Sequence, residues 1–150
     1  MAFTRADFYG LNLDWYAQDA DGQVAQFTTG FGPVPRAVFA DEAAYRAASD
    51  YFQSAAQVCS SRLSPWARAQ ESRGIGDYSL ALAEARRGLF SFEEEAYGPR
   101  HRLYAVPGAP VRLSSLPTEV QGFVSRFHLS GIRFIDIEVL DVLEHFDCVR

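Results

Sequence analysis

Two stretches near the start of the chain favour extended backbone. Residues 13–18 alternate between apolar and polar positions, a period of two that is typical of a β-strand. Residues 23–29 form a second stretch, in which threonines add β propensity. Between the two lies Asp21-Gly22, a pair typical of tight turns because glycine readily adopts positive φ. We therefore predict a β-hairpin that ends in the Gly/Pro-rich exit at residues 30–35.

Three longer stretches repeat apolar residues at spacings of three and four, the period of an amphipathic helix. They begin at Asp41, at Asp77 and at Leu116-Pro117, residue types that suit a helix N-terminus. A shorter helix is expected around residues 65–69. The predicted apolar stripes of the three main helices are Ala44, Ala48, Tyr51, Ala55 and Val58; Tyr78, Leu82, Ala85 and Leu89; and Val120, Phe123, Val124 and Phe127.

Further strands are predicted in the second half of the chain, at residues 101–106 and residues 132–140. A short extended piece at residues 89–92 precedes an acidic loop at residues 93–99. Strands near both ends with helices between them indicate an α+β fold. We predict one domain, residues 1–150, with a mainly antiparallel sheet, an N-terminal hairpin, about three helices and a C-terminal strand.

Composition excludes several kinds of chemistry. All 14 basic residues are arginines, so there is no lysine for a Schiff base or a P-loop. No apolar run approaches the roughly 18 residues of a membrane span, and the N-terminus lacks the apolar core of a signal peptide. Cys59 and Cys148 lie far apart without metal-ligand spacing, so two free thiols are expected. We therefore expect a cytoplasmic protein without a membrane partner.

The net charge of −5 is unevenly distributed. Residues 60–133 carry ten arginines and seven carboxylates, whereas residues 134–150 carry one arginine and five carboxylates. An acidic chain is a poor ligand for nucleic acid, whose phosphates are contacted mostly by clustered lysine and arginine. A nucleic-acid partner is therefore not expected, and the acidic C-terminus favours a basic protein partner.

The acidic C-terminus supplies the candidate site residues, Asp136, Glu138 and Asp141. On a strand, Asp136 and Glu138 share one face, and their carboxylates would lie about 6–7 Å apart. That spacing suits a metal with bridging waters or a catalytic pair of carboxylates. It equally suits docking of a basic partner. The ordinary explanation is a solvated strand face, because exposed carboxylates are the norm.

The other candidate motifs do not fit a metal site or a catalytic site. Asp19-Ala20-Asp21-Gly22 does not fit a calcium loop, because the twelfth position is Gly30 rather than a glutamate, so it is interpreted as a turn. No G-x-S-x-G motif frames a serine nucleophile. The three histidines show no ligand spacing and are interpreted as isolated; they are His101, His128 and His145.

Several short motifs together resemble a group of small bacterial proteins, some of them similar to immunity proteins of polymorphic toxin systems. In the hairpin they are Asp14-Trp15-Tyr16-Ala17, Asp21-Gly22, Val24-Ala25, Phe27-Thr28 and Gly32-Pro33-Val34-Pro35. In the second half they are Gly88-Leu89-Phe90-Ser91-Phe92, Tyr104, Pro107 and Leu116-Pro117. The resemblance implies a single cytoplasmic α+β domain that binds a partner, such as a toxin, and it brings no catalytic residue.

The leading hypothesis is a non-enzymatic binding protein that needs no cofactor. Its acidic face, made of Asp136, Glu138 and Asp141, would bind a basic toxin domain. Two alternatives stay open. One is a metal-assisted hydrolase that uses Asp136, Glu138 and His145, and the other is a small-ligand domain with a pocket around the aromatic residues Trp15, Tyr16 and Phe27.

Overall fold

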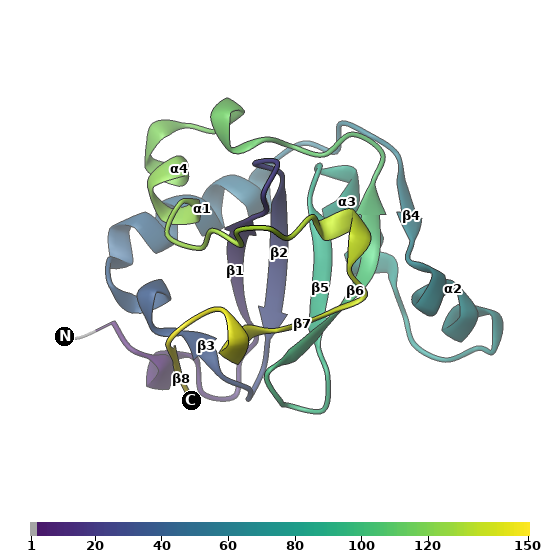
Figure 1. Cartoon of the computed structure of the whole chain (residues 1–150), viewed down its shortest axis with the longest axis horizontal. Helices are drawn as coiled ribbons and strands as arrows, with labels where there is room; N and C mark the ends of the chain where they lie inside the picture. The colour runs from purple at the N-terminus through teal and green to yellow at the C-terminus, as the bar shows by residue number, and fades with distance from the viewer. Residues whose placement is uncertain (1–2) are drawn as a thin grey trace.

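A mixed sheet of six strands forms the centre of the molecule (Figure 1). The computed structural model describes residues 3–150. The strands run in the order β1 (Leu13–Gln18), β2 (Val24–Thr29), β5 (Phe90–Glu94), β6 (Arg100–Pro107) and β4 (Ser61–Leu63), and β7 (Val139–Asp141) also pairs with β6. All neighbouring pairs are antiparallel except β2 and β5. A second, two-stranded sheet joins β3 (Val34–Pro35) to β8 (Cys148–Val149). The predicted α+β fold with a mainly antiparallel sheet is confirmed.

The described residues form four α-helices and five short 3₁₀ turns. The helices are α1 (Glu42–Ser54), α2 (Pro65–Ser72), α3 (Ser79–Arg86) and α4 (Thr118–Val124). The 3₁₀ turns are η1 (Arg5–Phe8), η2 (Arg36–Phe39), η3 (Leu113–Ser115), η4 (Phe134–Asp136) and η5 (Val142–Glu144). Asp41 caps α1 as predicted, because its side chain accepts a hydrogen bond from the Ala44 N–H at 3.1 Å. Val58 was predicted in the buried stripe of this helix; it lies beyond the end of α1 and is 73% exposed.

The predicted N-terminal hairpin is confirmed, and its turn has an additional role. Gly22 adopts a φ of +74°, which a tight turn requires. The carboxylate of Asp19 is buried and accepts hydrogen bonds from the N–H groups of Asp21 and Gln23 at 3.0 and 2.9 Å. Its second oxygen accepts from the N–H of Phe134 at 3.0 Å. The turn therefore also holds the C-terminal part of the chain against the sheet.

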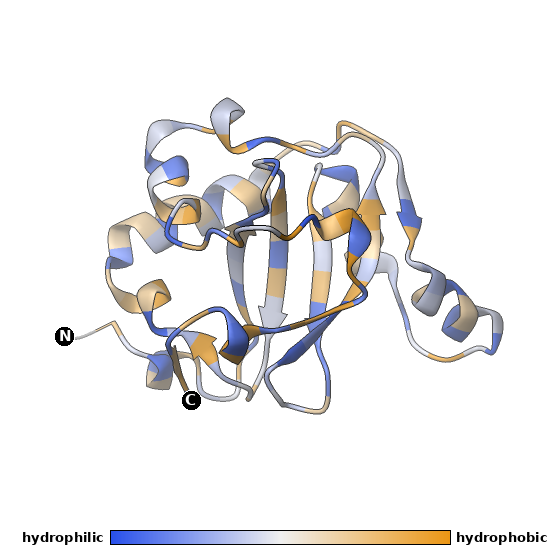
Figure 2. Ribbon diagram, in the orientation of Figure 1, coloured by the Kyte–Doolittle hydropathy of each residue, from blue (hydrophilic) through white to orange (hydrophobic). Residues whose placement is uncertain are grey.

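One face of the sheet is aromatic. The rings of Trp15, Phe27 and Phe92 stack across β1, β2 and β5, with centroids 4.6 and 4.8 Å apart. Phe134 packs against this stack from the C-terminal segment. His101 is also buried here, 2.8 Å from the Thr29 hydroxyl, and burial lowers its pKa to about 4. Figure 2 shows the alternation between the two faces as orange and paler or blue bands along β2 and β5.

The opposite face is polar and lies against α1 and α3. Gln26 and Ser91 donate hydrogen bonds to the Glu84 carboxylate of α3, at 3.0 and 2.6 Å. The next row across the sheet contains Asp14 and Glu93, on either side of Thr28. Burial, followed by the negative charges of Glu84 and Asp14, raises the pKa of Glu93 to about 8. Glu93 is therefore protonated in the folded protein at neutral pH.

The predicted strand over residues 132–140 is wrong in its first half. The chain forms the turn η4 at Phe134–Asp136, and only Val139–Asp141 pairs with the sheet as β7. The burial of Phe134 and its bond to Asp19 pull the backbone over the aromatic face instead of along its edge (Figure 1). The acidic loop predicted at residues 93–99 begins later, because β5 extends to Glu94.

Two further expectations can be compared with the structure. No helix within residues 3–150 is long and apolar enough to cross a membrane. Cys59 and Cys148 are both free thiols, as predicted.

The turn between β5 and β6 carries strain. Ala96 and Tyr97 adopt φ values of +50° and +59°, and the N–H of Gly98 donates to the Glu95 carbonyl at 3.0 Å. Two successive positive φ values define the hairpin turn that normally selects Asn-Gly or Gly-Gly. A non-glycine residue in this conformation costs roughly 1–2 kcal/mol. The sequence therefore places two unfavourable residues at this turn, one of them a tyrosine that is 64% exposed.

We expect Tyr97→Gly to stabilise the protein by about 1 kcal/mol, because relief of the positive-φ strain outweighs the greater backbone entropy of glycine in the unfolded chain. Urea unfolding measures the change. Tyr9→Gly is the matched control, since Tyr9 is equally an exposed tyrosine but has a φ of −59°. The control should lower stability; a Tyr97→Gly variant no more stable than the control contradicts the strain.

We expect stability to fall as the pH rises from 6.5 to 8. The folded protein binds the Glu93 proton more tightly than the unfolded chain, whose carboxyl has a pKa near 4.5, so deprotonation favours unfolding. The loss should be roughly 1 kcal/mol per pH unit. Urea unfolding across this range should show the slope in the wild type and little slope in Glu93→Gln. Glu119→Gln, at an exposed position of α4, should keep the pH dependence of the wild-type free energy of unfolding. If that pH dependence persists in Glu93→Gln, it does not come from Glu93.

Candidate functional site

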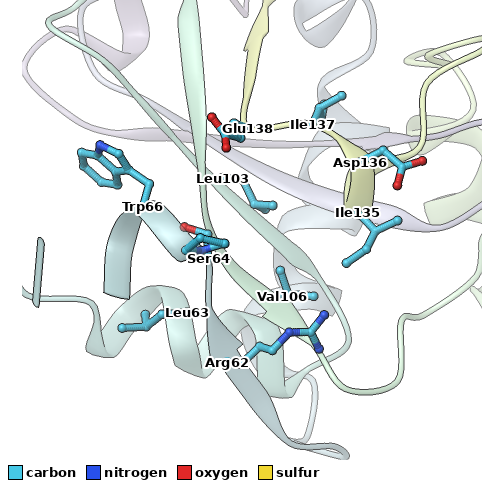
Figure 3. Close-up of a pocket in the computed structure, with 11 residues that line it drawn as sticks. Arg62, Leu63, Ser64, Trp66, Leu103, Val106, Ile135, Asp136, Ile137 and Glu138 are labelled. Carbon is cyan, nitrogen blue, oxygen red and sulfur yellow. The ribbon is translucent and has the colours of Figure 1, made fainter. Parts of the chain in front are cut away.

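A surface cavity of about 320 Å³ lies at the outer edge of β6. Two short strands share this edge: β4 pairs with residues 105–107 and β7 pairs with residues 100–102. Between them the backbone is held by the Leu103 N–H, which donates to the Glu138 carbonyl, and by the Ser64 N–H, which donates to the Tyr104 carbonyl, both at 2.8 Å. The cavity lies between the two strands. Its lining is Arg62, Leu63, Ser64, Pro65, Trp66, Leu103, Val106, Ile135, Asp136, Ile137 and Glu138 (Figure 3).

One wall is built by the transition from β4 to α2. Pro65 stands at the first position of α2, where its missing N–H is not needed. The Ser64 hydroxyl caps the helix by accepting from the Ala67 N–H at 3.1 Å. This geometry places Trp66 at the rim. Its ring stacks on Tyr104 with centroids 5.5 Å apart, and the Arg102 guanidinium lies 4.7 Å from its centre, a cation–π contact.

The other wall is the segment that follows the buried Phe134. Ile135 is 39% exposed, and Figure 3 shows its side chain directed toward Val106. Ile137 is half-buried and lines the cavity from the same segment. The floor is apolar, because Leu103 and Val106 of β6 are each only 5% exposed. The anchoring of Phe134 in the core thus fixes the position of the isoleucine wall.

The structure brings together two of the three predicted site residues. Asp136 and Glu138 line the cavity, whereas Asp141 does not. The Asp136 carboxylate points away from the cavity, where Arg133 lies 3.3 Å from it (Figure 3). Glu138 is exposed and takes part in none of the ion pairs of residues 3–150. Asp141 accepts a hydrogen bond from the Leu143 N–H at 2.9 Å and so caps η5. The three carboxylates do not converge.

The two alternative sites find less support in the geometry. Within residues 3–150, no group of three or more histidine, cysteine, aspartate or glutamate side chains is arranged to hold a metal ion. The aromatic residues of the proposed ligand pocket are core residues: Trp15 and Phe27 stack on one face of the sheet at 0% exposure, and Tyr16 is buried on the other.

Sequence reasoning missed the apolar and basic part of the cavity, namely Arg62, Trp66, Leu103 and Val106. These residues come from three segments that meet only through strand pairing with β6. One signal was present in the sequence. Trp66 is a lone tryptophan in an otherwise polar, arginine-rich stretch, and such a residue is often an interface anchor.

No family model, curated protein or solved structure matches the chain. The function is therefore inferred from the site itself. The cavity has an apolar floor, a tryptophan at its rim and charges of both signs around it, and protein-binding surfaces commonly combine an apolar centre, aromatic anchors and a polar rim. At about 320 Å³ the cavity is at the lower end of the range of roughly 300–1,000 Å³ for sites of drug-sized ligands. It suits an inserted side chain better than a large free ligand.

We expect Ser64→Ala to destabilise the protein by about 1 kcal/mol, because the first turn of α2 loses its cap. Fraying of this turn should also expose Trp66, which acrylamide quenching of fluorescence reports selectively, since the other tryptophan, Trp15, is fully buried. Ser72→Ala, at the exposed end of α2, is the control and should change stability by less than about 0.5 kcal/mol. Equal effects of the two variants would contradict the capping role.

Proposed function

We propose that this protein is a non-enzymatic, cytoplasmic binding protein of the immunity or inhibitor kind, which binds a basic toxin domain at the cavity beside β6. The observation that carries the proposal is the apolar cavity itself, with the half-buried Trp66 and the exposed Ile135 at its rim. The overall charge of −5 and the resemblance of the sequence to immunity-type proteins support it.

An apolar side chain of the partner would enter between Trp66 and Ile135. Burial of such a side chain contributes about 1.5–3 kcal/mol, and tryptophan and arginine are the residue types enriched at binding hot spots. The floor is held by β6, which pairs with β5 on one side and with β4 and β7 on the other, so little ordering is required when the partner binds.

The charges around the cavity define the partner further. Glu138 is free to contact a lysine or arginine beside the inserted side chain, whereas Asp136 already lies against Arg133. Asp141 adds to the negative field of the C-terminal segment but is engaged as a cap. Complementary charges of this kind mainly raise the association rate and the specificity. In this proposal Glu138 makes the acidic contact and the other two carboxylates contribute at longer range.

Co-expression with each toxin domain that the neighbouring genes are found to encode tests the proposal. Wild-type protein should restore growth, and the purified pair should form a complex. Ile135→Asp should weaken binding by at least about tenfold, because a charge enters the apolar cavity. Glu138→Arg should slow association and reduce its dependence on salt. Both are measured by surface plasmon resonance.

Leu143→Asp and Glu144→Arg are the matched controls, since they make the same changes at exposed positions outside the cavity. They should leave the affinity within about twofold. A wild-type protein that neither protects nor binds would overturn the function. Equal losses in the cavity variants and the controls would move the binding surface elsewhere.

A further inference from the structure

A second, polar hollow lies beside the other edge of the sheet, next to β1. It has a volume of about 660 Å³ and opens between the N-terminal turn η1 and helix α1. Figure 1 shows this N-terminal part of the chain on the opposite side of the sheet from β4 and α2. The hollow is therefore separate from the cavity beside β6.

Three aromatic rings in mutual contact line the hollow. Phe3 lies 5.8 Å from Phe8 and 5.2 Å from Tyr45, and Phe8 lies 5.6 Å from Tyr45, measured between ring centroids. The rings are inclined to one another by 45° to 74°, and Phe3 and Phe8 also contact the ring of Phe39. The face of an aromatic ring attracts cations, and clusters of such rings bind alkylammonium groups.

The charge of the hollow has the sign that such a ligand requires. Three carboxylates line it, those of Asp7, Asp14 and Glu42, against the single guanidinium of Arg46. Arg46 is paired with Glu42 at 3.1 Å, so it does not neutralise the other two. Asp14 accepts a hydrogen bond from the Thr28 hydroxyl at 2.7 Å but takes part in none of the ion pairs of residues 3–150. A half-buried carboxylate is thus left without a counter-charge.

Another buried polar group lies near Asp14 on the same face of β1. Tyr16 lies two residues further along β1, on the same face, and is 0% exposed. Within the described part of the chain its hydroxyl has no hydrogen-bond partner. It lies close enough to Asp14 and Tyr45 for both to raise its pKa, in addition to burial. Buried polar groups are nearly always paired, so this face of β1 carries two polar groups whose electrostatic or hydrogen-bonding requirement the fold leaves unmet, the Asp14 carboxylate and the Tyr16 hydroxyl; of the two, only Asp14 lines the hollow.

We propose that this hollow binds a small organic ammonium ion, with Asp14 as its counter-charge and the rings of Phe3, Phe8 and Tyr45 against its alkyl groups. The carboxylate supplies the charge attraction, and the rings replace the water that the alkyl groups lose on binding. This inference does not depend on the binding function of the cavity beside β6, because none of the residues lining the two spaces is shared.

Isothermal titration calorimetry of the full chain with three probes tests the proposal. The cationic probes are choline, a quaternary ammonium ion, and spermidine, a polyamine with primary ammonium ends. The neutral carbon analogue of choline is 3,3-dimethylbutan-1-ol. At least one cation should bind with a Kd below about 1 mM, and added salt should weaken it. The neutral analogue should bind at least about tenfold more weakly than choline or not at all.

Two substitutions should shift the affinity for the cation in opposite directions. Asp14→Asn keeps the shape and an oxygen for the Thr28 bond but removes the charge, so it should weaken binding about tenfold or more. Arg46→Ala frees Glu42 and removes the competing guanidinium, so it should strengthen binding. Loss of folding cannot produce such opposite shifts. Glu144→Gln, an exposed carboxylate far along the sequence and outside the hollow, is the control and should change nothing.

The proposal is overturned if neither cation binds with a Kd below about 1 mM. It is also overturned if the neutral analogue binds as well as choline, because the site would then be merely apolar. Unchanged affinity in Asp14→Asn, with circular dichroism showing the native fold, would equally remove Asp14 as the counter-charge.

Discussion

The buried carboxylate of Asp19 is the interaction on which the rest of the structure depends. It accepts two hydrogen bonds within its own turn and a third from the Phe134 N–H, 115 residues later in the chain. Hydrogen bonds to a charged group contribute roughly 1.5–3 kcal/mol each, and a buried carboxylate that lost them would carry a large desolvation penalty. The turn at Asp19 and the C-terminal segment are therefore held together, and Phe134 of this segment packs on the aromatic face of the sheet.

This anchoring has a direct consequence for the candidate site. With Phe134 in the core, the next residues emerge at the edge of the sheet, and Ile135 and Ile137 form one wall of the cavity. The opposite wall depends on a separate local device, the capped start of α2 at Ser64-Pro65. The site thus combines a short-range cap with a contact between distant parts of the chain. The same geometry spreads its acidic residues, and among residues 3–150 Glu138 is the one of the three candidates that lines the cavity without an ion pair.

The two faces of the sheet differ in chemistry, and this difference separates the two spaces at the surface. The aromatic face is filled at its centre by stacked rings and by a neutral, buried His101, and the cavity lies at its edge beside β6. The polar face carries Asp14, Glu84 and Glu93 partly covered by helices, and their pKa values are raised mainly by burial. Carboxylates kept in such surroundings are costly to the fold, and they cluster at functional sites more often than chance allows.

Local patterns determined a large part of this fold. The hairpin follows from alternation and from Gly22, and α1 follows from the Asp41 cap and its apolar stripe, because these signals act between residues a few positions apart. Only the tertiary structure decided the path of residues 132–138, since alternating isoleucine and acidic residues favour a strand until Phe134 is drawn into the core. It also decided the cavity, whose walls come from segments 70 residues apart in sequence, and the polar hollow beside Asp14. Such sites depend on strand pairing and on burial. Both involve contacts between residues far apart in the sequence, which local patterns do not predict.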